Sequence, residues 1–183
     1  MPLSPESLAP QNECAMLARE AQRGRADAMS ELATGQKAPE FNLPTDEGGE
    51  ISLSQLKGKI VVLYFYPKDD TPGCTTEAID FSSRIGDFEA AGAVVVGVSK
   101  DSVKKHQNFK AKHDLKVILA SDPEGEMIER YGVWVEKAMY GRTYMGIERA
   151  TFVIGPDGTI RHIWRKVKVK NHADEVLAAV QSL

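Results

Sequence analysis

The sequence predicts an α/β fold in which a mixed β-sheet is flanked by helices. Two runs, residues 60–66 and 93–99, are continuously apolar and rich in β-branched residues, as expected of strands buried on both faces. A segment with helical spacing follows each run. Residues 150–164 have the pattern of a β-hairpin, and a last helix comes after it. Strands that alternate with helices and then end in a hairpin and a helix favour a mixed sheet.

The first elements are predicted from turn residues and apolar spacing. Residues 38–44 form an extended segment, residues 46–50 a turn and residues 51–53 a short strand that returns beside the first. After the strand at 60–66, a helix opens close to residue 75. One face of this helix carries Ala78, Phe81, Ile85 and Phe88, and Gly92 ends it.

The later elements follow from the same signals. In order, we predict a surface helix at 102–114, a strand at 117–119, a helix start at 122–123, a long loop at 131–147, strands at 150–154 and 159–164 around a turn at 155–158, and a last helix capped by Asn171. Residues 165–170 alternate basic and apolar side chains, which is typical of a solvated strand edge, although such a run is also suited to an acidic partner.

Residues 1–34 differ from the rest of the chain. They hold three early prolines and an Ala-rich charged stretch with a weak apolar stripe, so we predict a flexible or weakly helical extension. The folded domain then spans residues 35–183. Cys14 lies in the extension, either as an incidental residue or as a second redox thiol.

Composition excludes several classes of protein. With 42% hydrophobic and 27% charged residues and a net charge of -3, nothing indicates a nucleic-acid or membrane partner. Two cysteines among 183 residues indicate a reducing compartment, and we expect a cytoplasmic protein. The four histidines have no metal-ligand spacing, so we predict no metal and no cofactor: His106, His113, His162 and His172.

Cys74 is the candidate reactive residue. It follows the strand at 60–66 through a proline-stiffened turn and stands in the first turn of the predicted helix. Unpaired N–H groups at a helix start favour an anion, and therefore the thiolate. A lone cysteine is otherwise most often a small buried hydrophobe. Thr71 can present a hydroxyl to the same pocket, Gly73 lets backbone approach a ligand, and a cation from elsewhere should complete the site.

The spacing Pro67-x-x-x-Thr71-x-x-Cys74 resembles the active-site signature of the peroxiredoxins, and residues 65–75 are similar to the bacterioferritin comigratory protein group of that family. The resemblance covers the chain from about residue 35 to its end and implies a thioredoxin-like fold. It also implies a thiol peroxidase in which Cys74 becomes a sulfenic acid, while Thr71 and Arg149 position the peroxide and Pro67 shapes the pocket. Arg149 stands where the family carries its arginine, before the run at 150–154.

Further pocket residues follow from the same resemblance. Glu77 either orients Arg149 or favours the helix start by its charge. Trp134 lies in the loop at 131–147, where it either lines the pocket or packs in the core.

The chain also departs from the pattern of the family that it resembles. Two places where members of the group carry a second, resolving cysteine hold Ile79 and Ile128. We therefore expect a one-cysteine mechanism, in which an outside thiol such as thioredoxin, glutaredoxin or glutathione reduces Cys74, with Cys14 as the alternative. The protein is expected to be a monomer or a weak dimer that reduces hydrogen peroxide and organic hydroperoxides.

Two other functions are compatible with the sequence. A peroxide sensor needs the same activated Cys74 but relays oxidation to a partner without efficient turnover. A general thiol-disulfide oxidoreductase is less well supported, because Cys-x-x-Cys is absent around Cys74.

Overall fold

The computed structural model describes residues 31–183. Most of the predicted extension at 1–34 lies outside the described residues, and so does Cys14. Residues Leu32–Leu183 form one unit. The boundary at residue 34 stays a prediction.

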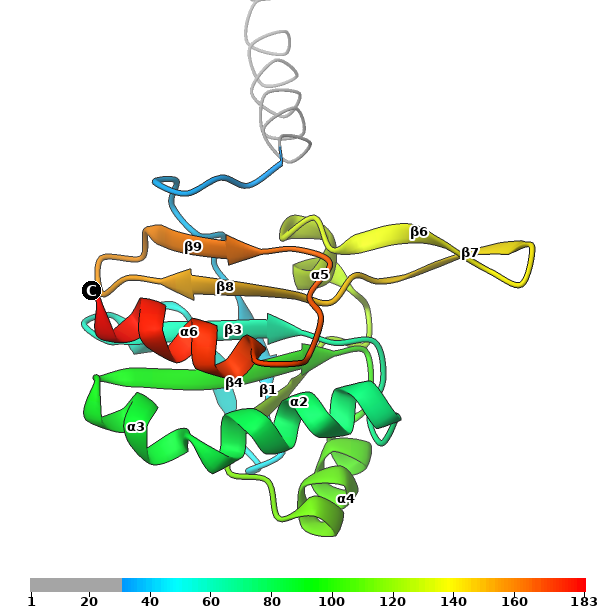
Figure 1. Cartoon of the computed structure of the whole chain (residues 1–183), viewed down its shortest axis with the longest axis horizontal. Coiled ribbons are helices and arrows are strands. Elements are labelled where there is room, and N and C mark those ends of the chain that lie inside the picture. Colours follow the sequence, from blue (N-terminus) through cyan, green and yellow to red (C-terminus); the bar gives the residue numbers. More distant parts are fainter. Residues whose placement is uncertain (1–30) are drawn as a thin grey trace, which may run out of the picture. The chain divides into compact units, whose positions relative to one another are not determined.

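A five-stranded mixed sheet forms the centre of this unit, in the order β5-β4-β3-β8-β9 (Figure 1). Its strands are β3 (Ile60–Phe65), β4 (Ala93–Ser99), β5 (Ile118–Ser121), β8 (Ala150–Ile154) and β9 (Ile160–Trp164). The strands β3, β4 and β5 are parallel, while β8 pairs antiparallel with both β3 and β9. The predicted α/β class and mixed sheet are confirmed.

Every residue of β3 is buried because the sheet is covered on both faces. Successive side chains of a strand point to opposite faces, so β3 contributes side chains to two separate cores. Val62 and Tyr64 belong to the core beneath the helices α2 (Pro72–Ser83), α3 (Ile85–Ala90), α4 (Val103–His113) and α6 (His172–Gln181). The continuous apolar run in the sequence is explained by this double burial.

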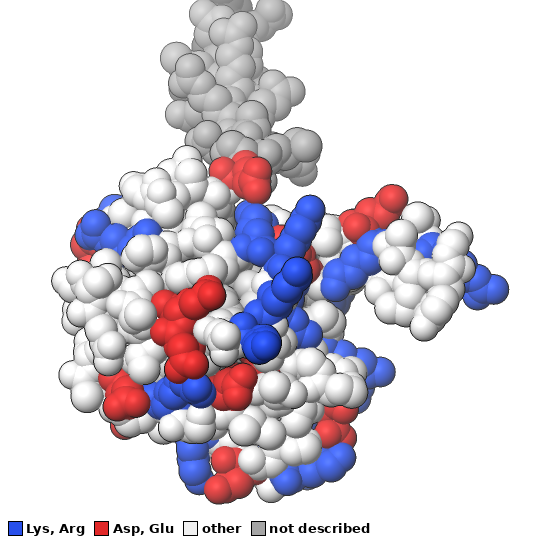
Figure 2. Space-filling view, in the orientation of Figure 1, with Lys and Arg blue, Asp and Glu red and all other residues white. Residues whose placement is uncertain are grey.

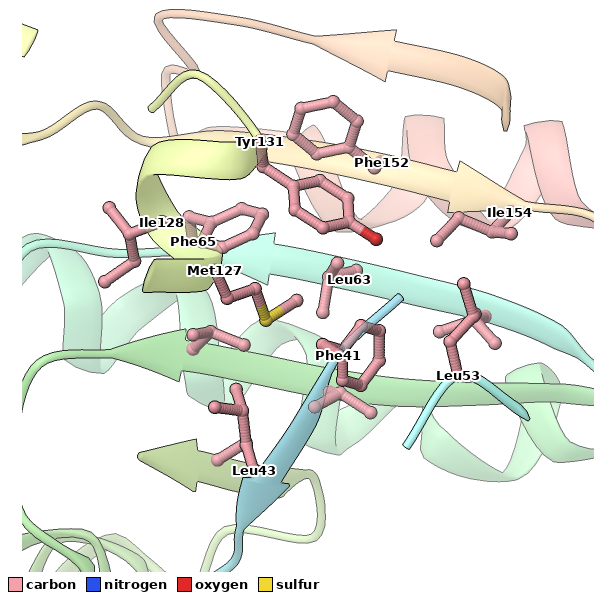
Figure 3. Close-up of a cluster of buried hydrophobic side chains, with 14 of the residues drawn as sticks. Phe41, Leu43, Leu53, Leu63, Phe65, Met127, Ile128, Tyr131, Phe152 and Ile154 are labelled. Carbon is pink, nitrogen blue, oxygen red and sulfur yellow. The ribbon is translucent and has the colours of Figure 1, made fainter. Parts of the chain in front are cut away.

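The second core lies on the other face of the sheet (Figure 3). There, Leu63 and Phe65 of β3 pack with Phe152 and Ile154 of β8. The cover is made by four short elements: β1 (Asn42–Pro44), β2 (Glu50–Ser52), the 3-10 helix η1 (Ser54–Leu56) and α5 (Glu126–Arg130). Figure 3 shows Phe41, Met127 and Tyr131 closing this core over the strands.

Three local predictions are wrong. The helix after Cys74 is two helices, α2 and α3, because the chain breaks at Arg84 (φ -109°, ψ 9°). The residues 131–147, predicted as a loop, contain a β-hairpin of β6 (Trp134–Met139) and β7 (Arg142–Ile147). Residues 165–170 form a loop after β9 and no strand edge.

Two smaller differences concern helix starts. Asn171 stands at the start of α6 in the left-handed region, and its side chain makes no capping hydrogen bond. α5 begins at Glu126, later than predicted, after Gly125. Asp122 still supports this helix, because its carboxylate accepts the N–H of Ile128. Among the described residues, no helix has the length and apolar character needed to cross a membrane.

The ring of Tyr64 in β3 lies close to the backbone of Gly97 in β4. Tyr64 is paired in register with Gly97 of β4, and its ring stacks on Phe81 with centroids 4.8 Å apart. A Cβ atom placed on Gly97 would lie 2.6 Å from the ring of Tyr64. The strand β4 therefore requires glycine at this position.

We expect Gly97→Ala to lower the free energy of unfolding by about 1–3 kcal/mol, because the buried ring has to move. Gly86 is a matched control, since it lies within α3 with no atom within 4 Å of an added Cβ. Gly86→Ala should raise the stability by about 0.5–1 kcal/mol. Denaturant unfolding measures both variants, and equal effects of the two would contradict the Tyr64 contact.

Candidate active site

Cys74 is the third residue of α2, directly behind the turn that follows β3. Thr71 occupies the N-cap position with extended backbone (φ -91°, ψ 153°), and Pro72 begins the helix with its fixed φ. The thiol is buried, with 2% of the residue exposed. The sequence signals therefore placed Cys74 correctly, in the first turn of a helix at the end of the central strand.

Arg149 supplies the predicted cation. The antiparallel pairing of β8 with β3 sets Ala150 opposite Phe65, so the residue before β8 lies at the same sheet edge as the turn leading to Cys74. Arg149 Nη2 donates a hydrogen bond to Cys74 Sγ over 3.3 Å. Its Nη1 donates to Glu77 Oε2 in a short ion pair. One guanidinium thus joins the thiol to a carboxylate.

Glu77 is fully enclosed one turn after Cys74. Burial raises the pKa of Glu77 to about 7, although the charge of Arg149 opposes this effect. Its Oε1 has no hydrogen-bond partner within the part of the chain that the structure describes. Burial also disfavours the charge on Arg149, but Glu77 and Cys74 more than offset this and raise the pKa of the guanidinium. Of the two roles considered for Glu77, the geometry favours orientation of Arg149.

Gly73 allows the guanidinium to reach the sulfur. A Cβ atom on Gly73 would lie 3.2 Å from Arg149 Nη2, which is closer than ordinary van der Waals contact. The absence of a side chain at Gly73 thus leaves room for the Arg149 guanidinium, while the approach of the backbone to a bound ligand stays a prediction.

Thr71 and Pro67 belong to the turn before α2. The Thr71 hydroxyl donates to the carbonyl of Lys68 over 2.8 Å, and the Thr71 carbonyl accepts the N–H of Thr75 over 2.8 Å. Since that donation uses the only hydrogen of the hydroxyl, its oxygen lone pairs are left to accept a hydrogen bond. Pro67 is exposed at the start of the turn.

A buried polar cluster fastens this turn to the sheet. Asp69 accepts hydrogen bonds from the Tyr66 hydroxyl over 2.6 Å and lies 2.7 Å from His106 Nδ1. Its backbone N–H donates to the carboxylate of Asp101 over 2.8 Å, and Asp101 also accepts from Ser99. These side chains are buried, so the turn has a rigid polar support. Sequence reasoning missed this cluster, although Asp69 lies inside the recognised motif.

Two further residues near Arg149 were also missed. His172 Nε2 lies 2.7 Å from the hydroxyl of Thr151, and burial together with the charge of Arg149 lowers the pKa of His172 to about 4. The imidazole is therefore neutral near pH 7. Lys137 of β6 has a pKa lowered by burial and then by Arg149, so it also borders the site.

Trp134 is not brought to Cys74 by any contact in residues 31–183. It is half-buried against the second core, on the face of the sheet away from α2, and Lys100 Nζ lies 4.6 Å from its ring centroid. Ile79 is exposed on α2, whereas Ile128 is fully buried. Cys14 lies outside the described residues.

Comparison with known proteins identifies the family. Residues 34–163 match the model of the AhpC/TSA family. A putative peroxiredoxin Bcp of Coxiella burnetii is 55% identical over 146 residues, covering 80% of this chain and 97% of the relative. Peroxiredoxin Bcp of Bacillus subtilis is 50% identical over 152 residues, covering 83% and 97%.

A solved structure agrees with these sequence relatives. The bacterioferritin comigratory protein of Xanthomonas campestris matches with a TM-score of 0.74 and 46% identity, over 78% of this chain and 90% of that one. The overall thioredoxin-like fold is shared with this solved structure. The chain therefore belongs to the AhpC/TSA family, as a peroxiredoxin of the bacterioferritin comigratory protein subfamily.

Proposed function

We propose that this peroxiredoxin reduces hydrogen peroxide and organic hydroperoxides through a sulfenic acid on Cys74. The observation that supports the proposal is the Arg149 guanidinium, which donates to Cys74 Sγ and is held by the buried Glu77. The thiolate is the nucleophilic form of cysteine, and the hydrogen bond from Arg149 fixes the position of the sulfur. As a peroxiredoxin, the chain is a thiol-dependent peroxidase.

The first half-reaction transfers one oxygen atom to the sulfur. The Cys74 thiolate attacks the terminal oxygen of R–O–O–H, the O–O bond breaks, and the products are Cys74–SOH and the alkoxide, which takes up one proton to become R–OH. With R as hydrogen, the second product is water. The sulfur is oxidised by two electrons and the peroxide is reduced by two.

Groups around the sulfur stabilise the leaving oxygen. The forked guanidinium of Arg149 donates at the position where negative charge develops, because Gly73 allows it to stand close. The free lone pairs of Thr71 can accept the peroxide hydrogen, which orients the O–O bond towards Cys74. Burial of the sulfur strengthens these interactions, since water is excluded.

Organic hydroperoxides are included on the strength of a relative. The Xanthomonas campestris protein is described as having alkyl peroxide reduction activity. Its 46% identity to this chain supports the same substrate class here.

We assign recycling to an outside thiol, with thioredoxin, glutaredoxin or glutathione as donors. Ile79 and Ile128 stand at the two positions where the family resemblance implies a resolving cysteine, so the oxidised Cys74 has no thiol partner at either position. A thiol then condenses with Cys74–SOH to a mixed disulfide and water. We further assign the protein to the cytoplasm, because its low cysteine content suits a reducing compartment. We expect it to be a monomer or a weak dimer.

Cys74→Ser should abolish peroxide reduction, because serine cannot form a thiolate or accept the oxygen in the same way. Cys14→Ser is the matched control and should keep most of the turnover with a small thiol or glutaredoxin. Peroxide consumption with excess thiol measures both. Loss of turnover in Cys14→Ser, together with a Cys14–Cys74 disulfide by mass spectrometry, would contradict the one-cysteine mechanism. Stoichiometric oxidation of the wild type without turnover would instead indicate a sensor.

Arg149→Ala should slow the reaction with hydrogen peroxide by about 10²–10³-fold, since one preorganised donor is lost. The rate with neutral iodoacetamide should fall much less. Alkylation also needs the thiolate, but it has no leaving oxygen atom whose negative charge Arg149 would stabilise. Gly73→Ala should show the same pattern more weakly, as the added methyl displaces the guanidinium. Stopped-flow rates measure all three proteins. Equal losses with both reagents would show that Arg149 only sets the ionisation of the thiol.

Glu77→Gln should remove a pH-dependent part of the stability. Burial raises the pKa of Glu77 from 4.5 to about 7. The contribution of the protonated Glu77 side chain to the free energy of unfolding is therefore fully present below about pH 4.5 and is lost as the pH rises through 7. The unfolding free energy of the variant relative to wild type should therefore increase by about 2–3 kcal/mol between pH 4.5 and 7. Denaturant unfolding at a series of pH values measures this, and a constant difference would refute the buried titration.

A further inference from the structure

Three exposed lysines stand in the loop between β9 and α6: Lys166, Lys168 and Lys170. They alternate with Val167 and Val169, which are half-buried. The valines thus hold the loop on the protein while the lysines point outward. We call these three lysines the basic ridge, and Figure 2 shows blue side chains lined up over this loop.

The basic ridge borders the active site. The N–H of Val167 donates to the backbone carbonyl of Arg149 over 2.9 Å, which ties the loop to the residue that contacts Cys74. At its other end, Lys170 and Val169 line a hollow of about 530 Å³ together with Pro72 and Gly73 at the start of α2. The lysines therefore lie along one side of the segment that carries the reactive thiol.

Acidic side chains lie near one end of the ridge, since Asp80 and Asp174 line the same hollow as Lys170, but Asp174 pairs with Arg84. Within residues 31–183, no carboxylate forms an ion pair with any of its three lysines. Two lysines of α4 do form ion pairs: Lys110 pairs with Asp46 at 2.9 Å and Lys112 with Asp70 at 2.6 Å. The three lysines stand at every second position of one loop, and such a row of like charges without paired carboxylates attracts an anionic partner.

The surroundings of the ridge suit a protein more than a small molecule. Lys166 and Lys168 project from an exposed loop, whereas small molecules bind in concave sites. The β6–β7 hairpin, whose Lys137 also lies near Arg149, exposes four large apolar side chains: Met139, Tyr140, Tyr144 and Met145. Tyr and Met are enriched in protein interfaces. An isolated two-stranded hairpin is only marginally stable in water, so a partner surface would also support it.

We propose that the basic ridge docks the carboxylate-rich surface of the protein thiol that reduces oxidised Cys74. This inference rests on the proposed peroxidase function and specifies its second half-reaction. The partner thiol R–SH attacks Cys74–SOH, an S–S bond forms, the S–O bond breaks and water leaves. A second thiol of the partner then attacks the mixed disulfide, which releases Cys74–SH and the oxidised partner.

Docking of this kind acts on the rate of encounter. Complementary charges raise association rates by 10–10³-fold at low ionic strength and lose much of this effect in salt. The lysines do not contact the sulfur, so they should not change its reaction with peroxide. The two half-reactions therefore respond differently to the ridge.

The test compares two triple variants. The ridge variant carries Lys166→Gln, Lys168→Gln and Lys170→Gln. The control variant carries Lys57→Gln, Lys59→Gln and Lys104→Gln, which removes three exposed lysines elsewhere on the protein. Each protein is oxidised with one equivalent of hydrogen peroxide and then mixed with a thiol probe. The probes are a seven-residue peptide with one central cysteine flanked by glutamates, its glutamine analogue, and glutathione. Loss of the sulfenic acid, followed by mass spectrometry, gives the second-order rate constants.

We expect the ridge variant to react about tenfold more slowly than wild type with the acidic peptide at low salt, with the difference shrinking at about 0.5 M salt. Its rates with the glutamine peptide and glutathione should change less than about twofold, and the control variant should resemble wild type. Equal loss in the control variant, or an unchanged rate with the acidic peptide, would overturn the proposal. An equal loss with glutathione would assign the ridge to small carboxylate-bearing thiols and also overturn it.

Failure of the proposed function has a different signature. If wild-type Cys74 does not form a sulfenic acid with hydrogen peroxide, then the first half-reaction is absent and the peroxidase proposal falls. If oxidation is normal in wild type and in both variants, only the docking role of the ridge is under test.

Discussion

The site depends on one shared cation. Arg149 donates both to Cys74 Sγ and to Glu77, and the three groups come from two elements of the fold. Cys74 and Glu77 lie one turn apart on α2, while Arg149 arrives from β8, which pairs with the same strand that leads into α2. Glu77 is almost completely buried, so removing the guanidinium would raise its pKa further and leave a protonated acid without its partner. Arg149 is thus held between the Glu77 carboxylate and the sulfur.

Two adjacent aspartates, Asp69 and Asp70, fix the active-site turn through a buried and an exposed set of contacts. Asp69 faces inward to Tyr66 and His106, whereas Asp70 faces outward, where His113 and Lys112 hydrogen-bond its carboxylate and lower its pKa. Asp70 also has a φ of 59°, in the left-handed region that Asp tolerates better than most residues. Both acids fasten the turn to α4. The short connection from β3 to Cys74 is thus constrained by buried polar contacts as well as by its prolines, and the sulfur is held at the guanidinium.

Sequence reasoning worked best where one local pattern decided the outcome. The apolar run of β3 and the helix start after Pro72 placed Cys74, and the strand at 150–154 placed Arg149. It failed where the structure depends on contacts between distant segments. The β6–β7 hairpin turns at Tyr140 and Gly141, which both have positive φ, but tyrosine is not a recognised signal for such a turn. His106 looked like one of four scattered histidines because its partner Asp69 is distant in the sequence.

Charges in this protein act by two different physical rules, according to their burial. Arg149 and Glu77 interact in a site from which water is largely excluded, so their effect is strong, depends on distances of tenths of an ångström and is hardly screened by salt. The lysines between β9 and α6 stand in water, where each contributes little on its own and ions screen it. Buried charge can therefore direct bond breaking, which needs a fixed geometry, whereas exposed charge can only raise the frequency of encounter. A dependence on salt confined to the reductive half of the cycle follows from this separation, because peroxides carry no charge for the exposed lysines to attract.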